Sequence, residues 1–343
     1  MPTSFELGGA VRVKEVFALK VRRSEESRLG LKLFPMAEKD ATKIVYERHQ
    51  LLRGVQANRG LMGPTQPVSR PGFDQFETDP GYYGDHFLIT EKDLVNRRRL
   101  GDWEQFDTQG TQTAFASTFL EQRQSDRLEK NVFDLLGTGQ YEGQDAQGAR
   151  KYFDIYAIQK FTPGTLFSDT ANSTPLKFLR DTVATAEKGL SVDFRGGAFM
   201  MNRPTLNTIL SNTKAGDLGD RRFDIGQTLN SVNELNDILL ANDLPKVELY
   251  NEGFYPEPDG TAFQRFIPDG RILLLGKRTD GEPIGEYWLT RAAQNGGKPG
   301  YWVDVVDNTT GPLADPPHVL VKAGHNGGPK LWYPEAVISI TGY

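Results

Sequence analysis

The feature that most constrains this chain is the segment 54–87, which is rich in Gly and Pro and carries only isolated aromatic residues. Its apolar residues follow neither a helical nor an alternating spacing. Connections of this length are uncommon inside a folded domain, and they usually bind something or lack a fixed structure. We therefore expect a segment that projects from the fold and contacts another molecule. A surface excursion without a partner is the alternative.

The return of this segment, 90–101, reads TEKDLVNRRRLG, and its residues 92–100 predict a short charged helix or turn. On a helix only residues three or four positions apart meet, so Asp93 reaches Arg97 but no acid of the segment reaches all three arginines. At least one of Arg97, Arg98 and Arg99 should therefore pair with a carboxylate elsewhere. We take these arginines, with Phe73 and Phe76, as candidate contact residues. A solvated run of charge is the alternative.

Composition excludes several classes of protein. The 343 residues are enough for roughly two domains. There is no cysteine, so disulfides, thiolate metal sites and a cysteine nucleophile are excluded. No secretory leader is recognised, and no run approaches the ~20 apolar residues of a membrane span.

Charge is unevenly distributed along the chain. Residues 1–60 carry twelve Lys and Arg against seven Asp and Glu, although the whole chain has a net charge of -5. The pattern indicates a basic arm on an acidic body, and such arms are often interaction segments. It supports only weak, non-specific attraction to nucleic acid. A solvated N-terminal strand and helix is the alternative.

The strongest expected element is a helix over 111–136. Phe115, Phe119, Leu128 and Val132 have the spacing of one buried face, and the middle, 121–127, is almost wholly polar. This pattern predicts a long spine lying across a flat domain, buried at both ends and exposed in the middle. An ordinary amphipathic surface helix is the alternative.

The other expected elements make an α+β chain. We expect strand-like pieces at 11–19 and 29–34, a short helix within 37–53, and helices at 174–189, 204–210 and 230–242. Further strands are expected at 151–161, 191–201, 262–267, 271–275, 301–306, 318–323 and 336–341. Helices and strands are segregated rather than strictly alternating, which disfavours a doubly wound fold.

No motif indicates catalysis. The segment 270–278 has five residues between its glycines where a P-loop has four, and Arg where Ser or Thr would hold magnesium. The histidines, His49, His86, His318 and His325, are not at metal-ligand spacing. His325 lies in a Gly-rich stretch and is interpreted as a turn residue. We expect no catalytic, metal or cofactor site.

Several segments together resemble a known family. They are 90–101, the SVDF strand at 191–194, the YNEGFY to PDG hairpin at 250–270 with the apolar strand 272–275, and the closing LWYPEA at 331–336. In this order they resemble the lambda-type major capsid protein E family of tailed bacteriophages. The resemblance implies the Hong Kong 97-like fold, with an N-terminal arm at 1–53 and an extended loop at 54–100. The spine helix would lie in a peripheral domain at 101–165 and 277–343, and an axial domain would occupy 166–276.

The resemblance also implies a function. Family members form the pentamers and hexamers of an icosahedral shell that encloses double-stranded DNA. The chain would then be a virion capsid protein, assembled in the host cytoplasm, with no enzymatic activity and no membrane partner. It would meet copies of itself, a portal, possible decoration proteins and a separate scaffolding protein, and packaged DNA non-specifically. Arg97, Arg98, Arg99, Phe73 and Phe76 become candidate inter-subunit contacts. The competing class is an α+β enzyme or binding module with a site built from scattered residues.

Overall fold

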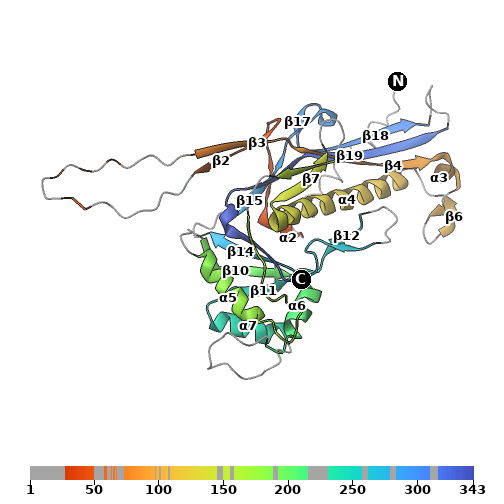
Figure 1. Ribbon diagram of the computed structural model, residues 1–343. Helices are drawn as coiled ribbons and strands as arrows, with labels where there is room; N and C mark the ends of the chain where they lie inside the picture. Colours follow the sequence, from red (N-terminus) through yellow and green to blue (C-terminus); the bar gives the residue numbers. More distant parts are fainter. Residues whose placement is uncertain are drawn as a thin grey trace.

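The fold consists of an elongated body, a second unit beside it and a projecting hairpin (Figure 1). The computed structural model describes residues 28–49, 58–59, 63, 65, 67, 73–96, 98–99, 102–106, 109–144, 150–154, 158–187, 192–214, 231–256, 262–278, 283–309 and 316–343. The strand expected at 11–19 and the residue Arg97 lie outside these ranges. Within them the chain is α+β, as expected.

Six α-helices are described. They are α2 (Leu29–Leu33), α3 (Glu91–Asn96), α4 (Gln109–Thr138), α5 (Pro175–Ala186), α6 (Arg203–Leu210) and α7 (Val232–Ala241). Two 3-10 turns, η2 (Ala293–Asn295) and η3 (Pro334–Ala336), complete the helical elements of the described part. Two helix starts can be recognised from the sequence: Pro175 lies in the first turn of α5, and Asn202 caps α6.

The longest strand, β19, organises the body sheet. This sheet has the order β1-β15-β19-β18, with β4 also pairing β19. Its strands are β1 (Met36–Glu38), β4 (Gly81–Thr90), β15 (Gly285–Leu289), β18 (Tyr301–Asn308) and β19 (His318–Leu331). One face carries Ile89, Val303 and Val319, which are buried against Ala116 and Leu120 of α4. The alternation of apolar residues in β4, β18 and β19 thus seats the helix on the sheet.

The second unit is built on a sheet of order β11-β10-β14-β20-β9. Its strands are β9 (Gln159–Phe161), β10 (Val192–Met201), β11 (Lys246–Leu249), β14 (Arg271–Arg278) and β20 (Val337–Thr341). Leu179 of α5, Leu206 of α6 and Leu239 of α7 pack into one core with Phe199 and Leu274 of this sheet. Strands from 159–161 and 337–341 therefore complete a sheet whose other strands lie between 192 and 278.

The remaining strands form short pairs. They are β2 (Ile44–His49) with β3 (Phe73–Thr78), β5 (Arg98–Arg99) with β6 (Asp102–Phe106), β7 (Gln140–Gln144) with β8 (Arg150–Asp154), β12 (Gly253–Phe254) with β13 (Gln264–Arg265), and β16 (Arg291–Ala292) with β17 (Lys298–Pro299). The β2–β3 pair projects away from the body (Figure 1).

The expected spine helix is confirmed as α4, although its burial differs from the expectation. Phe115 was expected on the buried face but is 49% exposed, and its ring meets Phe87 of β4 edge-on at 6.4 Å. The polar middle is only partly exposed to solvent: Gln122 is exposed, whereas Gln124 and Ser125 are 8% and 6% exposed. The helix lies between the body sheet and the β12–β13 hairpin, and these two elements partly cover its middle.

Two expectations near the N-terminus are wrong. The stretch predicted as extended, 29–34, forms helix α2, because Leu31 and Phe34 enter the core beneath α4. The helix expected within 37–53 is replaced by β1 and β2. β2 pairs with β3 across a connection of more than twenty residues, so local spacing carries no signal for it. Its β-branched start, Ile44 and Val45, favours the strand.

Other boundaries also differ. The strand expected over 151–161 is two strands, β8 and β9, and the one expected over 262–267 is only β13. The helix or turn expected at 92–100 ends at Asn96, and Arg98 and Arg99 belong to β5. The expected strand at 191–201 is β10, and its pairing with β14 shifts register between Asp193 and Ala198, where its two glycines lie.

The Gly-rich stretch around His325 is a strand, so the interpretation of His325 as a turn residue is wrong. β19 continues to Leu331, pairing β4 and then β15. Its glycines reflect close neighbours: a Cβ at Gly324 would lie 2.5 Å from the Trp302 ring, and one at Gly328 would lie 2.3 Å from the Tyr141 hydroxyl. Glycine is required here for side-chain packing across a strand and not for a turn.

Candidate functional site

The residues predicted to make contacts lie at two ends of the molecule. Phe73 and Phe76 are on β3 of the projecting hairpin, opposite His49 and Tyr46 of β2. Arg98 and Arg99 are on β5, beyond the far end of α3 (Figure 1). The fold therefore does not bring the two groups together. The structure describes their backbone only, and their contacts stay a prediction.

Helix α3 is fixed firmly at its start. The Thr90 backbone N–H and hydroxyl donate to Asp93 Oδ2 at 3.1 and 2.7 Å, which caps the helix. The Gln112 side chain donates to the Asp93 carbonyl at 3.0 Å and joins α3 to α4. This end of the body, which leads into β5, is thus tied to the spine helix.

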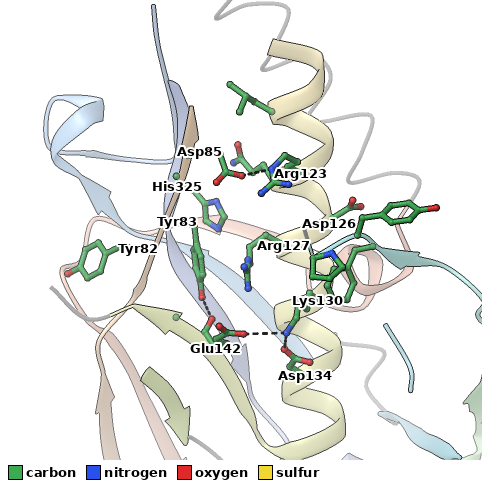
Figure 2. A pocket seen from close by; sticks show the side chains of 18 of the residues that line it. Tyr82, Tyr83, Asp85, Arg123, Asp126, Arg127, Lys130, Asp134, Glu142 and His325 are labelled. Atoms are coloured by element: carbon green, nitrogen blue, oxygen red, sulfur yellow. Dashed lines mark hydrogen bonds and ion pairs between the residues drawn. The ribbon is translucent and has the colours of Figure 1, made fainter. Parts of the chain in front are cut away.

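A polar groove of about 690 Å³ runs along α4. Its walls are β4, β7 and the β12–β13 hairpin, and α4 contributes a row of charged side chains to it (Figure 2). The row contains Arg123, Arg127, Lys130 and Asp134, whose spacing of three and four residues places them on one face.

Most of these charges are paired inside the groove. Arg123 Nε lies 2.7 Å from Asp85 Oδ2 of β4. Lys130 pairs with Asp134 one turn on, and its Nζ is 3.8 Å from Glu142 of β7 (Figure 2). Burial raises the pKa of Asp134, and Lys130 opposes that rise. The groove thus joins α4 to β4 and β7 through ion pairs, and these stiffen the body.

An aromatic cluster closes one side of the groove. The Arg127 guanidinium lies 5.6 Å from the centre of the Tyr83 ring, and the Tyr83 hydroxyl donates to the Glu142 carbonyl at 2.7 Å. The Tyr83 ring is 5.0 Å from the His325 ring, and Tyr287 Oη is 3.3 Å from His325 Nε2. These residues connect β4, β7, β15 and β19 around one point on the helix (Figure 2).

His325 is held neutral by this environment. It is fully buried, and burial first and the Arg127 charge second lower its pKa to about 3. Tyr287 Oη accepts from Asn131 at 3.1 Å, which leaves its proton for His325 Nε2. The neutral ring therefore acts as an acceptor, and its charged form has no favourable place.

This geometry predicts an acid-sensitive fold. In the unfolded chain His325 takes up a proton near its ordinary pKa of 6.5. In the folded chain its pKa is about 3, so the ring stays neutral down to that pH. The neutral ring therefore contributes its stabilisation of the folded state above pH 6.5. This contribution is lost as the pH falls from 6.5 toward 3, by about 2 kcal/mol between pH 7 and about pH 5. His325→Phe should remove this component of the pH dependence, at a cost of about 1–2 kcal/mol at pH 7 for the lost acceptor.

Denaturant unfolding of both proteins at the two pH values checks this prediction. Comparison with the wild type isolates His325 from the buried acids, whose raised pKa values act in the opposite direction. An equal loss of stability in wild type and His325→Phe on acidification would contradict it.

A second polar junction joins α4 to helix α2 and to the segment that follows β11. The carboxylate of Glu129, on α4, accepts from the Gly30 N–H at 2.8 Å and from the Tyr250 hydroxyl at 2.5 Å. Arg28 pairs with Asp126, also on α4, and reaches Glu252 at 3.0 Å. Burial raises the pKa of Glu129. Helix α2, the spine helix and the end of β11 therefore meet at one polar point.

The ion pairs of the groove and of the second junction join α4 to its neighbours. In the described part of the chain no three His, Asp or Glu side chains could hold a metal ion. No described helix is long and apolar enough to cross a membrane. The segment 271–278, which resembles a P-loop only loosely, is strand β14 in the centre of its sheet. The charged groups described above hold neighbouring elements together.

A model of a known protein family matches most of the chain. Residues 26–295 match the family model described as phage major capsid protein E. The chain belongs to this family. It is therefore a structural subunit of the icosahedral capsid of a tailed phage, built from many copies of itself, and not an enzyme.

The fold of this major capsid protein is similar to that of a solved capsid and of a solved phage-related protein. The capsid of a native GTA particle is 13% identical, with a TM-score of 0.51 over 90% of this chain and 88% of that one. A phage-related protein from Bordetella bronchiseptica RB50 is 12% identical, with a TM-score of 0.50 over 94% and 96%. The putative capsid protein of a prophage of E. coli CFT073 is 17% identical, with a TM-score of 0.47 over 78% and 79%. No curated protein sequence matches the chain.

The groove was not predicted from the sequence. Its signal was present in the spacing of Arg123, Arg127, Lys130 and Asp134, which marks a charged face on α4. The partners Asp85 and Glu142 lie in other elements, and Asp85 precedes Arg123 by 38 residues. Spacing alone could not bring them to it.

Proposed function

We propose that this major capsid protein assembles into pentamers and hexamers that enclose double-stranded DNA. The observation that carries the proposal is the β2–β3 hairpin, which leaves the body as a two-stranded ribbon (Figure 1). A two-stranded hairpin is at best marginally stable alone in water. A neighbouring copy of the chain would supply the surface that it lacks in a monomer.

The charge of the hairpin tip indicates the kind of surface it meets. Residues 50–72, between the two strands, include Arg53, Arg59 and Arg70 and no Asp or Glu. The rest of the chain beyond residue 60 is strongly acidic. The opposite charge of a neighbour's body would attract this basic segment. Two such segments carry the same charge and would repel each other.

We propose the division of the chain expected from its family. The arm is 1–53 and the extended loop 54–100, the peripheral domain is 101–165 with 277–343, and the axial domain is 166–276. Packing of α5, α6 and α7 on one sheet supports the axial domain as a unit, and that sheet also takes β9 and β20 from outside 166–276. The strands of the projecting hairpin begin at Ile44 and end at Thr78, and β4 pairs β19 in the body.

The acidic body also suits a container for DNA. A surface of the same sign as the phosphates would enclose packaged DNA without binding it tightly, while basic segments meet it non-specifically. A portal, decoration proteins and a separate scaffolding protein are proposed as further partners, on the analogy of the family. Assembly would take place in the host cytoplasm.

Protease sensitivity tests the role of the extended loop. We expect cleavage within 54–87 to be fast in the free subunit and at least about tenfold slower in assembled particles, because a neighbour covers the loop. Mass spectrometry of the fragments over time measures both rates. A cut in another exposed connection facing solvent in both states serves as the internal control. Equal rates at 54–87 in both states would contradict an inter-subunit loop.

The capsomer itself is tested by counting copies. Mass photometry of the purified chain, alone and with its scaffolding protein, should show species of five and six copies. A single monomeric species in both samples would contradict the proposal.

A further inference from the structure

The root of the projecting hairpin is fastened to the body at several points. The Lys39 N–H donates to the Leu289 carbonyl at 2.9 Å, and the Arg291 N–H donates to the Ala41 carbonyl at 3.3 Å. The Arg291 side chain also binds Asp40, with Nη2 at 2.8 Å from Oδ2. These contacts hold the segment between β1 and β2, before the hairpin begins.

The contact on the hairpin itself comes from a buried lysine. Lys330, near the end of β19, is 4% exposed, and its Nζ donates to the Val45 carbonyl at 2.8 Å. Val45 is the second residue of β2. It follows Ile44, which is buried, so the lysine binds the strand close to the point where it leaves the body.

Two tryptophan rings enclose the Lys330 ammonium. Its Nζ lies 4.1 Å from the ring centre of Trp288 on β15 and 3.8 Å from that of Trp332, just after β19. Trp288 is oriented by its own hydrogen bond, from Nε1 to Glu286 Oε2 at 3.0 Å. Trp332 is 38% exposed and forms the outer wall. An ammonium over the face of an indole is attracted by the ring quadrupole, most strongly when desolvated.

Packing alone does not explain a lysine at this position. Burying an ammonium is unfavourable unless specific partners replace its water, and methionine would fill a similar slot without that penalty. The ammonium makes directional contacts that methionine cannot make. The two rings hold the ammonium in place, and the ammonium holds the Val45 carbonyl of β2. Lys330 with Trp288 and Trp332, here called the clamp, thus connects the hairpin to the β15–β19 part of the body sheet.

We propose that Lys330, held between Trp288 and Trp332, is a positioning residue that sets the direction in which the β2–β3 hairpin leaves the body. This inference rests on the proposed function, in which the hairpin must reach a neighbouring subunit. The clamp then couples the geometry of the body sheet to the geometry of the shell. A subunit without it folds but presents its hairpin at a variable angle.

Lys330→Met in the full-length chain tests the proposal, with Lys330→Arg as the conservative variant. Lys43→Met is the matched control, because Lys43 lies beside the same root and its ion pair with Glu77 is about half exposed on both sides. Amide hydrogen exchange of the free subunit is measured in β2 and β3 and, for comparison, in β10 and β14. Particle yield is measured by sedimentation and electron microscopy.

We expect Lys330→Met to raise exchange in β2 and β3 by about tenfold or more, to leave β10 and β14 unchanged, and to lower the particle yield by a similar factor. Lys330→Arg should recover most of both, and Lys43→Met should behave as wild type. Unchanged exchange at the hairpin, or wild-type yield despite faster exchange, would overturn the proposal. Wild-type chain that forms no particles would instead overturn the proposed function.

If Lys330→Met fails to fold, Trp332→Ala decides the question. This change removes the exposed wall and keeps the lysine, so the subunit should fold. The same rise in hairpin exchange and the same loss of yield are expected. Exchange and yield like those of the wild type would overturn the proposal.

Discussion

Replacing residues 50–72 by Asn-Gly is expected to give a folded subunit that forms no shells. His49 and Phe73 are paired at the end of the described hairpin, and Asn-Gly is a turn that closes such a pair directly. The folded subunit should be at least as stable as the wild type, because a shorter connection costs less closure entropy. Shells should disappear, because the variant lacks the segment that we propose contacts the neighbour.

Circular dichroism melting and electron microscopy of the same preparation measure the two effects. A second variant, in which the 23 positions of 50–72 are filled with Gly and Ser, keeps the length and removes the side chains. It should also fold and fail to assemble, because its arginines and apolar residues are gone. Shells at wild-type yield from the shortened variant would show that the segment makes no essential contact.

Charge reversal at the other end of the body is expected to have the next largest effect. Arg98→Glu or Arg99→Glu should leave the subunit folded and reduce or misdirect assembly. Replacing attraction by repulsion across a contact costs several kcal/mol, and about 1.4 kcal/mol is already tenfold in an equilibrium constant. Successive positions of a strand belong to opposite faces, so the two variants test the two faces of β5 separately.

Particle yield and circular dichroism are measured together on these variants. Arg98→Lys and Arg99→Lys keep the positive charge and serve as matched controls, with a smaller loss where a bidentate pair is required. Wild-type yield from both glutamate variants would mean that this arginine run makes no inter-subunit contact.

The sequence predicted those elements whose partners are local. The spacing of Phe119, Leu128 and Val132 predicts α4, and the Pro that opens α5 marks its start. Leu29–Leu33 reads equally well as a strand or a helix, because a run of five residues is too short for a period to appear. Packing beneath α4 decides between them.

Long-range packing explains the larger errors. The Gly-rich stretch around His325 has the composition of a turn, yet its glycines make room for Trp302 and Tyr141 in a continuous strand. The polar residues in the middle of α4 suggest exposure, whereas Gln124 is covered by elements far away in sequence. Neither partner could be recognised from local pattern. The family resemblance, which depends on the order of segments along the whole chain, was confirmed.

Electron microscopy of the protein, expressed alone and with the separate scaffolding protein that we propose for it, tests the central claim most directly. The account predicts closed icosahedral shells, or rings of five and six subunits where closure is incomplete. A monodisperse monomer under both conditions and under molecular crowding would contradict it.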